Sequence, residues 1–520
     1  MKLRLACFVA GASGFIALSY EILWYRLFAF VSKGKPAAFG VLLGAYLLGI
    51  ALGSFGARWL CRRTADGTAG VGGPTARALS LCLLAGNVVS FLVAPATGWF
   101  ATLGHWHWAL GVVALATILL GAVLPLTSHL AIVADDAAGA RLSYLYLCNI
   151  LGSCLGSLGT GFVAMDHGTT MQIAVVIACL GFALAGGVRL AVDPSSRSLA
   201  WKAAPSAVAT LAVLAGSHAA FDQLYERLLR GKDFTADEHF LETVENRSGL
   251  IHVTADEQVY GGGAYDGALN VSLVHDKNLI FRAFAVSYLH PHPRRMLMIG
   301  LASGSWATVL AASPGLEHLT IIEINPGYLE IIARHPDVAG ILADPKVDIQ
   351  IDDGRRWLLA HPDERFDVIV MNTTWHWRAN ITNLLSREFF ALVKSHMTQG
   401  GLFYLNSTGS LDVCKTVMSS FPSTFRVSNF YAASDRAILP DPSTWKPLLE
   451  SYRIGGAPVL DLATAEGRAT EARLVRFMQP RGLESDVDSD DGVRARCASG
   501  EVITDDNMRS EWRSERAPWR

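Results

Sequence analysis

The stretch Met296–Leu310, MLMIGLASGSWATVL, decides the fold of the second half of the chain. Its first four residues are apolar and predict a short buried strand, whereas the apolar residues after Gly304 recur at helical spacing. Between them lies a turn bounded by Gly300 and Gly304, where glycine lets the backbone approach a ligand closely. The stretch therefore predicts a strand, a ligand-binding turn and a helix in succession.

The same alternation continues downstream of this unit. Short apolar runs, separated by helical stretches, occur at HLTIIEI (318–324), VDIQID (347–352) and FDVIVMN (366–372). This alternation is typical of a parallel sheet covered by helices on both faces. Because ligands of such sheets bind beyond the carboxyl ends of the strands, the residues that follow each run are candidate site residues.

Polar side chains stand at these positions. Glu323 is placed to accept hydrogen bonds from ribose hydroxyls or to cap the next helix. Asp353 is placed to hold an adenine amino group or a substrate amine, or likewise to cap a helix. The other candidates at the strand ends are Asp352, Asn372, Thr373, Trp375 and His376. Such groups after four successive strands predict a nucleoside-binding site.

The first part of the chain has a different character. Of the 520 residues, 51% are hydrophobic and 17% charged, with a mean hydropathy of +0.30, which is too apolar for an ordinary soluble enzyme. The excess lies in long runs able to cross a hydrocarbon core of about 30 Å. The predicted spans are 4–25, 36–60, 78–99, 107–134, 143–164 and 171–192, with a weaker seventh candidate at 203–221.

The basic residues of this half bear on its orientation. If the spans alternate, Lys33 and Lys35 fall on one side of the membrane. The amino-terminal side then holds Lys2, Arg4, Arg58, Arg62, Arg63, Arg77, Arg141, Arg189, Arg197 and Lys202. This excess of basic residues predicts that the amino-terminal side is cytoplasmic. Seven crossings would export the second half. Six crossings, with 203–221 lying in the interface or re-entering, would keep it inside. We favour six, because the nucleoside is cytosolic. Near the end of the first span, Glu21 and Arg26 either pair at the interface or serve a function.

Charge, cysteines and composition define the remaining regions. A formal net charge of −2 gives no basic field for a nucleic-acid partner. The eight cysteines lack metal-ligand spacing, so we predict reduced, buried thiols and no metal site. We expect a transmembrane helical bundle at 1–221, a small β-strand domain at 222–292, a Rossmann-like domain at 293–470 and a charged, loosely ordered carboxyl-terminal tail at 471–520.

The successive motifs resemble those of a known family. MIGLASGS, IIEINPGYLEII, VDIQIDDGRRWL, FDVIVMNTT and LLSREFFALVKSHMTQGGLFYLNS look like motifs of the spermidine synthase (polyamine aminopropyltransferase) family, over roughly residues 245–440. The first half resembles that of bacterial members fused to a transmembrane bundle. The resemblance implies an α/β fold of the class I methyltransferase (Rossmann-like) type behind a small β-domain.

The resemblance also implies a substrate and its contacts. S-adenosylmethionine or its decarboxylated form would place its ribose at Glu323, its adenine at Asp353 and its methionine-derived chain beside the turn from Gly300 through Ser303 to Gly304. Thr373 and Trp375 are assigned to the same ligand. Trp375, together with Trp306 and Trp377, is expected to flank the cleft and to offer aromatic faces to the sulfonium.

The sequence departs from the family pattern at three positions. Ser303 stands where the family has the aspartate that holds the donor amine, and Asn372 and Trp375 stand where it has aspartates after the fourth strand. An amide cannot take a proton from an attacking amine, so conventional transfer to putrescine is disfavoured. Because a carboxylate at position 303 would repel the carboxylate of intact S-adenosylmethionine, we hypothesise that Ser303 allows the intact donor to bind.

Four residues are candidates to replace the missing catalytic carboxylate. Asp352 and His376 follow the third and fourth strands, and Tyr265 and Asp266 lie in the glycine-rich β-region that is expected to form a lid. Sulfonium chemistry needs little beyond positioning and desolvation, because the leaving group is a neutral thioether. Loss of one carboxylate is therefore compatible with activity.

The sequence predicts a membrane-bound enzyme that cleaves or transfers the propyl-side group of its donor and releases methylthioadenosine. Its expected partners are a small-molecule amine or a lipid-phase acceptor, and membrane lipids; a homo-oligomer is left open. Two alternatives stay open as well, an S-adenosylmethionine-dependent methyltransferase and a non-catalytic nucleoside-sensing domain that regulates a transporter-like bundle. The expected location is the bacterial inner membrane, with the catalytic domain in the cytoplasm.

Overall fold

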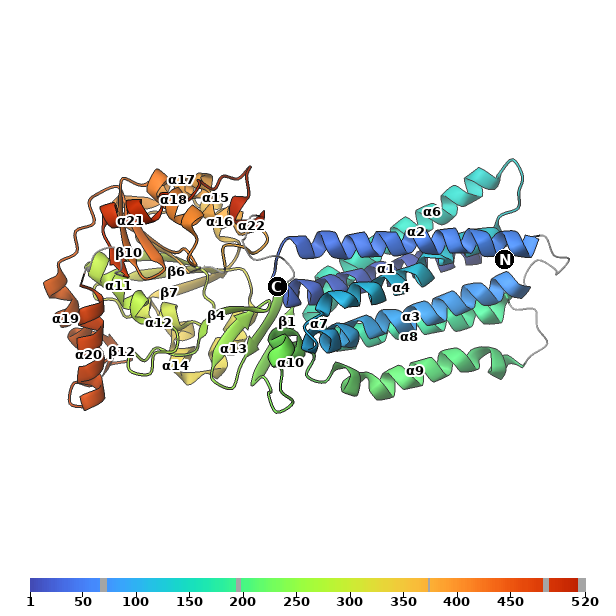
Figure 1. Ribbon diagram of the computed structural model, residues 1–520, viewed down its shortest axis with the longest axis horizontal. Helices are drawn as coiled ribbons and strands as arrows, with labels where there is room; N and C mark the ends of the chain where they lie inside the picture. Colours follow the sequence, from blue (N-terminus) through green and yellow to red (C-terminus); the bar gives the residue numbers. More distant parts are fainter. Residues whose placement is uncertain (66–72, 193–197, 373–374, 480–485, 513–520) are drawn as a thin grey trace.

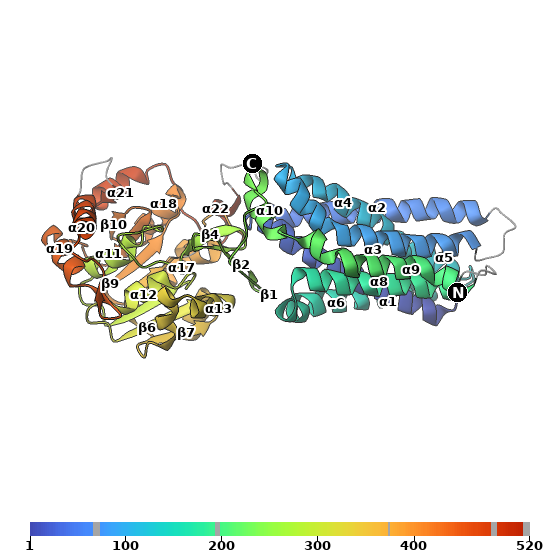
Figure 2. The ribbon, with the colours of Figure 1, turned by 90° about the horizontal axis from the view of Figure 1, so that it is seen from below.

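The computed structural model describes residues 1–65, 73–192, 198–372, 375–479 and 486–512. A bundle of long helices and an α/β domain lie end to end, with a small sheet between them (Figure 1). The view from below shows the same separation into two halves (Figure 2). The fold class predicted from the sequence is confirmed: an apolar helical bundle, a small antiparallel sheet and a mixed α/β domain.

Seven helical segments within the described residues are long and apolar enough to cross a membrane. Two of them are interrupted: α4 is followed directly by α5, and α6 continues through the π-helical turn η2 into α7. The elements are α1 (Leu3–Val31), α2 (Ala37–Ala65), α3 (Gly73–Thr102), η1 (Trp106–Trp108), α4 (Ala109–Gly121), α5 (Val123–Ala131), α6 (Ala138–Gly159), η2 (Thr160–Ala164), α7 (Met165–His167), α8 (Thr170–Val192) and α9 (Leu199–Phe221). Helices suit this role because they satisfy their backbone hydrogen bonds internally.

The seventh segment, α9, differs from the arrangement favoured by the sequence. It is a helix of 23 residues that packs along α8, parallel to the bundle axis, rather than lying across the end of the bundle (Figure 1). Lys202, Pro205 and His218 lower its mean hydropathy and made it look too weak to span. With seven segments, the amino terminus and the α/β domain lie at opposite ends of the bundle.

A short connector and a small sheet follow the bundle. The connector consists of α10 (Leu224–Arg230) and η3 (Gly231–Asp233). The sheet is antiparallel, as predicted, with strands in the order β1 (Glu242–Asn246), β2 (Gly249–Val253), β3 (Gln258–Gly261) and β4 (Ala264–Ala268). It therefore lies between the two halves and contacts both.

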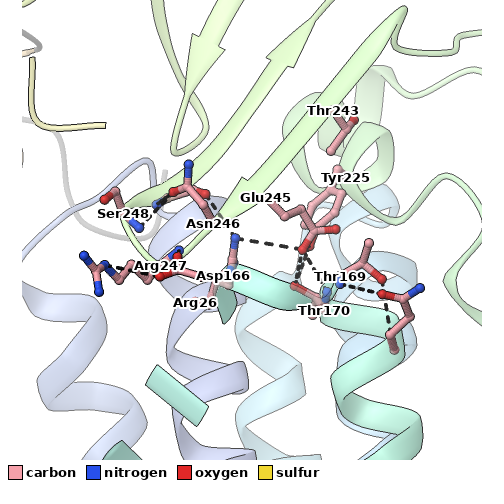
Figure 3. A network of polar contacts seen from close by, with 12 residues as sticks. Arg26, Asp166, Thr169, Thr170, Tyr225, Thr243, Glu245, Asn246, Arg247 and Ser248 are labelled. Atoms are coloured by element: carbon pink, nitrogen blue, oxygen red, sulfur yellow. Dashed lines mark hydrogen bonds and ion pairs between the residues drawn. The ribbon is translucent and has the colours of Figure 1, made fainter. Parts of the chain in front are cut away.

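The small sheet is joined to the bundle by a polar network (Figure 3). The Glu245 carboxylate accepts hydrogen bonds from the backbone N–H of Thr170 at 2.8 Å and from its hydroxyl at 2.7 Å, and the Tyr225 hydroxyl lies 3.0 Å away. Arg247 forms an ion pair with Asp166 at 3.4 Å. Because a buried carboxylate is stable only with such donors, these contacts fix the sheet on the ends of the helices.

The second half contains a mixed sheet whose order is β14-β10-β11-β9-β8-β5-β6-β7. The four strands predicted from the sequence, β5 (Arg295–Ile299), β6 (His318–Glu323), β7 (Val347–Ile351) and β8 (Phe366–Met371), are parallel to one another. The chain runs outward from β5 to β7 and then returns to β8, so the strand order reverses between β5 and β8. Ligands of such sheets bind at this point, beyond the carboxyl ends.

Helices cover both faces of this sheet, and apolar side chains fill each layer between sheet and helices. The remaining elements up to β11 are α11 (Phe281–Leu289), α12 (Ser305–Ala311), α13 (Gly327–Arg334), α14 (Pro336–Ala339), η4 (Gly340–Ala343), α15 (Gly354–Ala360), α16 (Thr382–Leu385), α17 (Arg387–Ser395), β9 (Met397–Asn406), α18 (Leu411–Ser420), β10 (Ser423–Val427) and β11 (Phe430–Ser434).

The carboxyl-terminal segment differs from the loosely ordered tail that its charge suggested. The elements after β11 are α19 (Pro442–Ser451), β12 (Arg453–Ile454), β13 (Ala457–Pro458), α20 (Ala465–Phe477), β14 (Val487–Asp488), α21 (Asp490–Arg496) and α22 (Arg509–Trp512). The end of α20 and all of β14, α21 and α22 lie within the predicted tail, 471–520. β14 adds a strand to the main sheet. Its Asp488 forms a buried ion pair with Arg426 at 2.7 Å, and Asp505 binds Arg355 at 2.6 Å. The charges are therefore partners of the α/β domain rather than a sign of disorder.

The prediction of reduced cysteines is wrong for one pair. Cys414 in α18 and Cys497 after α21 form a disulfide, with Cα atoms 5.6 Å apart and 83 residues between them in sequence. Both residues are buried. A pairing over such a distance depends on the fold, so spacing along the chain could not reveal it.

Candidate active site

One cavity of about 1510 Å³ connects the α/β domain, the small sheet and the bundle. At one end, which we call the donor end, it is lined by Gly300, Glu323, Asp352, Asp353 and Asn372, which follow strands β5 to β8. At the other end, which we call the membrane end, it is lined by Ile22, Tyr25, Arg26, Leu158, Gly161 and Phe162. Tyr265 and Asp266 of β4 line the cavity between the two ends.

The glycine turn is shaped by Glu323. Gly300, Ala302 and Gly304 all have positive φ angles, so the turn bends sharply. The Glu323 carboxylate accepts hydrogen bonds from the N–H of Leu301 at 2.7 Å and of Ala302 at 3.3 Å, and its second oxygen accepts from Asn325 N–H at 2.8 Å. Burial raises the pKa of Glu323, and these N–H donors act against that effect. Oε1, which accepts one hydrogen bond, retains acceptor capacity for a ribose hydroxyl.

The acidic pair after β7 has well-defined partners. Asp353 caps α15 by accepting a hydrogen bond from the N–H of Arg356 at 2.9 Å, which is the capping role considered from the sequence. Asp352 forms an ion pair with the Arg356 side chain. Both aspartates also line the cavity, so their positions are fixed at the edge where a nucleoside base would lie.

Asn372 belongs to a chain of amides that ends on a cation. Asn406 donates from Nδ2 to Asn372 Oδ1 at 3.2 Å, and Asn429 donates in turn to Asn406 Oδ1 at 2.7 Å. The buried guanidinium of Arg282 donates to Asn429 and lies over the Phe430 ring at 5.2 Å. In this series of side-chain amides the donor groups point toward Asn372, so the series would stabilise negative charge at that position.

The lid residues Tyr265 and Asp266 lie close to the donor end but differ in chemistry. Tyr265 donates to Asn278 Oδ1 at 3.0 Å, and burial raises the pKa of Tyr265 to about 12, so it stays protonated at neutral pH. Asp266 is half-buried and accepts a hydrogen bond from the Tyr328 hydroxyl. Burial raises its pKa, partly offset by Arg378 and Tyr328.

Gly261 makes room for this pair. A Cβ atom on Gly261 would lie 2.1 Å from Asp266 Oδ2 and 2.2 Å from the Tyr328 hydroxyl. No side chain fits there without moving one of the two groups. The glycine-rich turn of the small sheet therefore adjoins the cavity, where the sequence analysis expected a lid.

Other predicted residues lie in or beside the site with different roles. Ser303 and Gly304 belong to the glycine turn but are not cavity-lining residues, and the Ser303 hydroxyl lies 2.9 Å from that of Ser305. His376 stands behind the lining residue Thr408, with Nδ1 2.7 Å from its hydroxyl. Thr373 lies outside the described residues.

The three tryptophans expected to flank the cleft have different positions. Trp375 lines the cavity and donates to the backbone oxygen of Tyr265 at 3.3 Å, which ties the β8 end to the lid. Trp377 stacks on Trp375. Trp306 is buried in the core and stacks on Phe430 at 4.6 Å, away from the cavity surface.

Several lining residues were missed by the sequence analysis. They are Asn278, Arg282, Tyr328, Arg378, Asn406 and Asn429. Asn406 ends β9, so the rule that site residues follow strands would have found it if it had been extended to a fifth strand. The others come from helices and loops, where no local pattern marks them.

Comparisons with known proteins find similarity to one family. The spermine/spermidine synthase domain matches residues 283–440. A polyamine aminopropyltransferase of Mycobacterium tuberculosis is 26% identical over 419 residues and covers 76% of each chain. Polyamine aminopropyltransferase 2 of Ralstonia nicotianae is 24% identical over 432 residues and covers 78% of each chain. Both alignments are longer than the part of the chain after Phe221, so the similarity extends into the bundle.

Among solved structures, the spermidine synthase from Thermotoga maritima is similar over 45% of this chain and 88% of that chain, at 16% identity and a TM-score of 0.34.

Proposed function

Because the chain belongs to the spermidine synthase (polyamine aminopropyltransferase) family, we propose that it is a membrane-bound transferase for the propyl-side group of an S-adenosyl donor. The family uses decarboxylated S-adenosylmethionine as its aminopropyl donor and an amine as acceptor. For this chain, the donor is S-adenosylmethionine or its decarboxylated form. The nucleoside product is methylthioadenosine.

One observation carries this proposal: the acidic groups after β6 and β7 and the lid carboxylate of Asp266 line the same cavity. Glu323 is placed to receive the ribose hydroxyls, Asp353 the adenine amino group and the Gly300–Gly304 turn the chain that bears the sulfonium. Carboxylates near a sulfonium also lower the energy of its positive charge in a site that excludes water.

The reaction requires one bond to form and one to break. The nitrogen of the amine attacks the propyl carbon bonded to sulfur, and the electron pair of the carbon–sulfur bond goes to sulfur. The leaving group is neutral methylthioadenosine, and the new ammonium must lose a proton. Positioning the two reactants accounts for most of the rate, because the leaving group needs no protonation.

Asp266 is the best candidate for the proton acceptor. Asn372, at the family's catalytic position, cannot act as a base, and Tyr265, with its pKa of about 12, stays protonated. Asp352 is engaged by Arg356. Asp266 keeps one carboxylate oxygen beside its bond to Tyr328, and its raised pKa makes it a stronger base than an exposed carboxylate.

The orientation in the membrane follows from the count of spans. Seven spans put Lys33 and Lys35 near the α/β domain, and the opposite end of the bundle receives Lys2, Arg4, Arg58, Arg62, Arg77, Arg141, Arg189 and Lys202. The excess of basic residues favours a cytoplasmic amino terminus. The α/β domain then lies on the non-cytoplasmic face of the bacterial inner membrane, in agreement with its disulfide. This proposal replaces the cytoplasmic placement that six spans would give, and it requires the S-adenosyl donor to reach the non-cytoplasmic face.

Reporter fusions test that orientation independently of activity. Alkaline phosphatase fused after the α/β domain is expected to be active, and green fluorescent protein at the same position is expected to be dark. A fluorescent fusion would restore the cytoplasmic placement.

The test of the function is product identity. Detergent-purified protein is incubated with each donor, with and without putrescine, and the nucleosides are identified by mass spectrometry. Methylthioadenosine is expected, with dependence on an amine. S-adenosylhomocysteine would identify a methyltransferase instead. If both donors bind and neither is consumed, even with membrane lipids present, the domain is a nucleoside sensor.

A further inference from the structure

A buried cation without a full set of partners lies at the membrane end of the cavity (Figure 3). Arg26 in α1 is 9% exposed, and its Nη2 donates to the carbonyl of Gly249 at 3.0 Å and lies 3.9 Å from Glu245 Oε2. Within the described residues, its Nε and Nη1 have no hydrogen-bond partner. A buried charged donor without a hydrogen-bond acceptor costs free energy. The Nε and Nη1 edge of the guanidinium is therefore suited to an anionic ligand.

The cavity reaches the lipid-facing surface where two transmembrane helices separate. Around Gly11 and Phe15, α1 is in close contact with α6, because a Cβ atom on Gly152 would lie 1.9 Å from Gly11 O, and one on Gly156 2.3 Å from Phe15 O. Toward the α/β domain the contact loosens, and a Cβ atom on Gly161 would find its nearest neighbour, on Ile22, at 3.9 Å. The π-helical turn η2 begins here, a feature frequent at functional sites.

The walls of this opening are apolar. Leu158 and Phe162 line the cavity and are 51% and 62% exposed, inside a candidate membrane span. In a membrane, such side chains face acyl chains. An apolar wall that ends at a buried arginine, close to the polar domain, matches a molecule with a hydrocarbon chain and an anionic head group.

We propose that the acceptor is a phospholipid with a primary amine in its head group, which enters the cavity laterally between α1 and η2. The proposal rests on the proposed function, which supplies the requirement for an amine. The phosphate is bound by the guanidinium of Arg26, the acyl chains lie along Leu158 and Phe162, and the amine reaches toward the donor end. The lipid nitrogen forms a bond to the propyl carbon, the carbon–sulfur bond breaks to give neutral methylthioadenosine, and Asp266 takes the proton released from nitrogen.

The experiment uses the full chain in lipid nanodiscs, which leave both faces accessible to either donor. Discs contain phosphatidylethanolamine or, as the lipid without a primary amine, phosphatidylcholine. Soluble phosphoethanolamine, which has the same head group without acyl chains, and putrescine are tested in phosphatidylcholine discs. Methylthioadenosine and the mass of the lipid are measured together. We expect phosphatidylethanolamine alone among the lipids to gain an aminopropyl group, or its carboxylated equivalent from the intact donor.

Two variants test the route. Arg26→Ala removes charged hydrogen bonds and is expected to lower turnover of the lipid by about 10- to 100-fold, with Arg58→Ala, at an exposed arginine elsewhere in the bundle, as the matched control. Because Arg26 also holds the small sheet, Gly161→Leu is the second variant and narrows the opening. Its control is Gly44→Leu, where a Cβ atom meets nothing within 4 Å. Both controls are expected to keep full turnover.

The outcomes separate the two proposals. If putrescine is used but the lipid is not, the lipid acceptor is wrong and the proposed function stands. Equal use of phosphoethanolamine and the lipid would overturn the lateral route, as would full lipid turnover by both Arg26→Ala and Gly161→Leu. If no donor is consumed in any arm, the proposed function fails, and the lipid reaction with it.

Discussion

The two ends of the cavity are built on opposite principles. At the donor end, Glu323 and Asp353 are held by backbone amides and a helix terminus. At the membrane end, Arg26 keeps two nitrogens without partners among the described residues, and the exposed side chains of Leu158 and Phe162 line the cavity. The difference teaches that polar groups with hydrogen-bond partners position a ligand of fixed shape. A buried cation without a full set of partners, in an apolar wall, instead favours a ligand that carries the opposite charge.

The largest expected effect comes from the carboxylate between the two ends. Asp266→Asn is expected to lower the rate of methylthioadenosine formation by about 10²–10⁴-fold, the usual contribution of a general base. The pKa of Asp266 is raised by burial, so its ionised fraction grows with pH over a range above that of an exposed carboxyl, and the wild-type rate should rise over that range. Single-turnover rates against pH measure both effects.

Asp352→Asn is the comparison for this variant, because Asp352 lines the same cavity but is paired with Arg356. The Asp352→Asn variant should keep the rise of the single-turnover rate with pH on the acidic side of the profile. An equal loss in both variants, or an unchanged limb in Asp266→Asn, would remove Asp266 from the role of base.

The next effect isolates the donor end. Glu323→Gln removes the charge that accepts from the glycine turn and would accept from ribose, so donor binding is expected to weaken by about 10- to 100-fold. Calorimetric titration of either donor measures it, with Glu317→Gln, which loses only an exposed pair with Arg294, as the control. The KM for the acceptor should change little. A parallel rise in that KM would mean that the two ends are not separate sites.

A smaller effect concerns the position where the resemblance to the family implies a carboxylate. Asn372→Asp introduces a carboxylate there, and Asn406 already donates a hydrogen bond to this position. Turnover of putrescine is expected to rise about tenfold, since a base beside a soluble amine is regained. The matched control is Asn270→Asp, in a loop outside the cavity. No increase in the steady-state rate would show that position 372 does not limit the choice of acceptor.

The smallest catalytic effect is expected far from both ends. Cys414→Ser breaks the disulfide to Cys497, which should lower the free energy of unfolding by about 2–4 kcal/mol and leave the turnover rate unchanged. Thermal melting with and without reductant measures the loss, and Cys154→Ser, at an exposed free cysteine, is the control. A melting temperature that does not respond to the variant would mean that these thiols are not bonded in the protein.

The donor end could be predicted from the sequence because its residues follow strands. The runs at 295–299, 318–323, 347–351 and 366–371 were recognisable by their apolar character, and the parallel sheet then places Glu323, Asp353 and Asn372 at one edge. The bundle was equally visible, since long apolar runs have few alternatives. Both features depend on local pattern, which sequence records directly.

Features that depend on contacts between distant segments were not predictable. The charges of Asp488 and Asp505 looked like those of a disordered tail, because their partners Arg426 and Arg355 are far away in sequence. The disulfide and the amide chain behind Asn372 have the same origin. Arg26 was noticed at a helix end, but its contact with the small sheet and its place in the cavity emerge only when the two halves are assembled.

The most direct test of the account is a structure of the full chain in phosphatidylethanolamine nanodiscs, determined by cryo-electron microscopy with decarboxylated S-adenosylmethionine or the intact donor. The account predicts density for the nucleoside against Glu323 and Asp353 and density for a lipid head group at Arg26, within one continuous cavity. A nucleoside bound elsewhere, or side chains that close the cavity between Asp266 and Arg26 in both complexes, would contradict it.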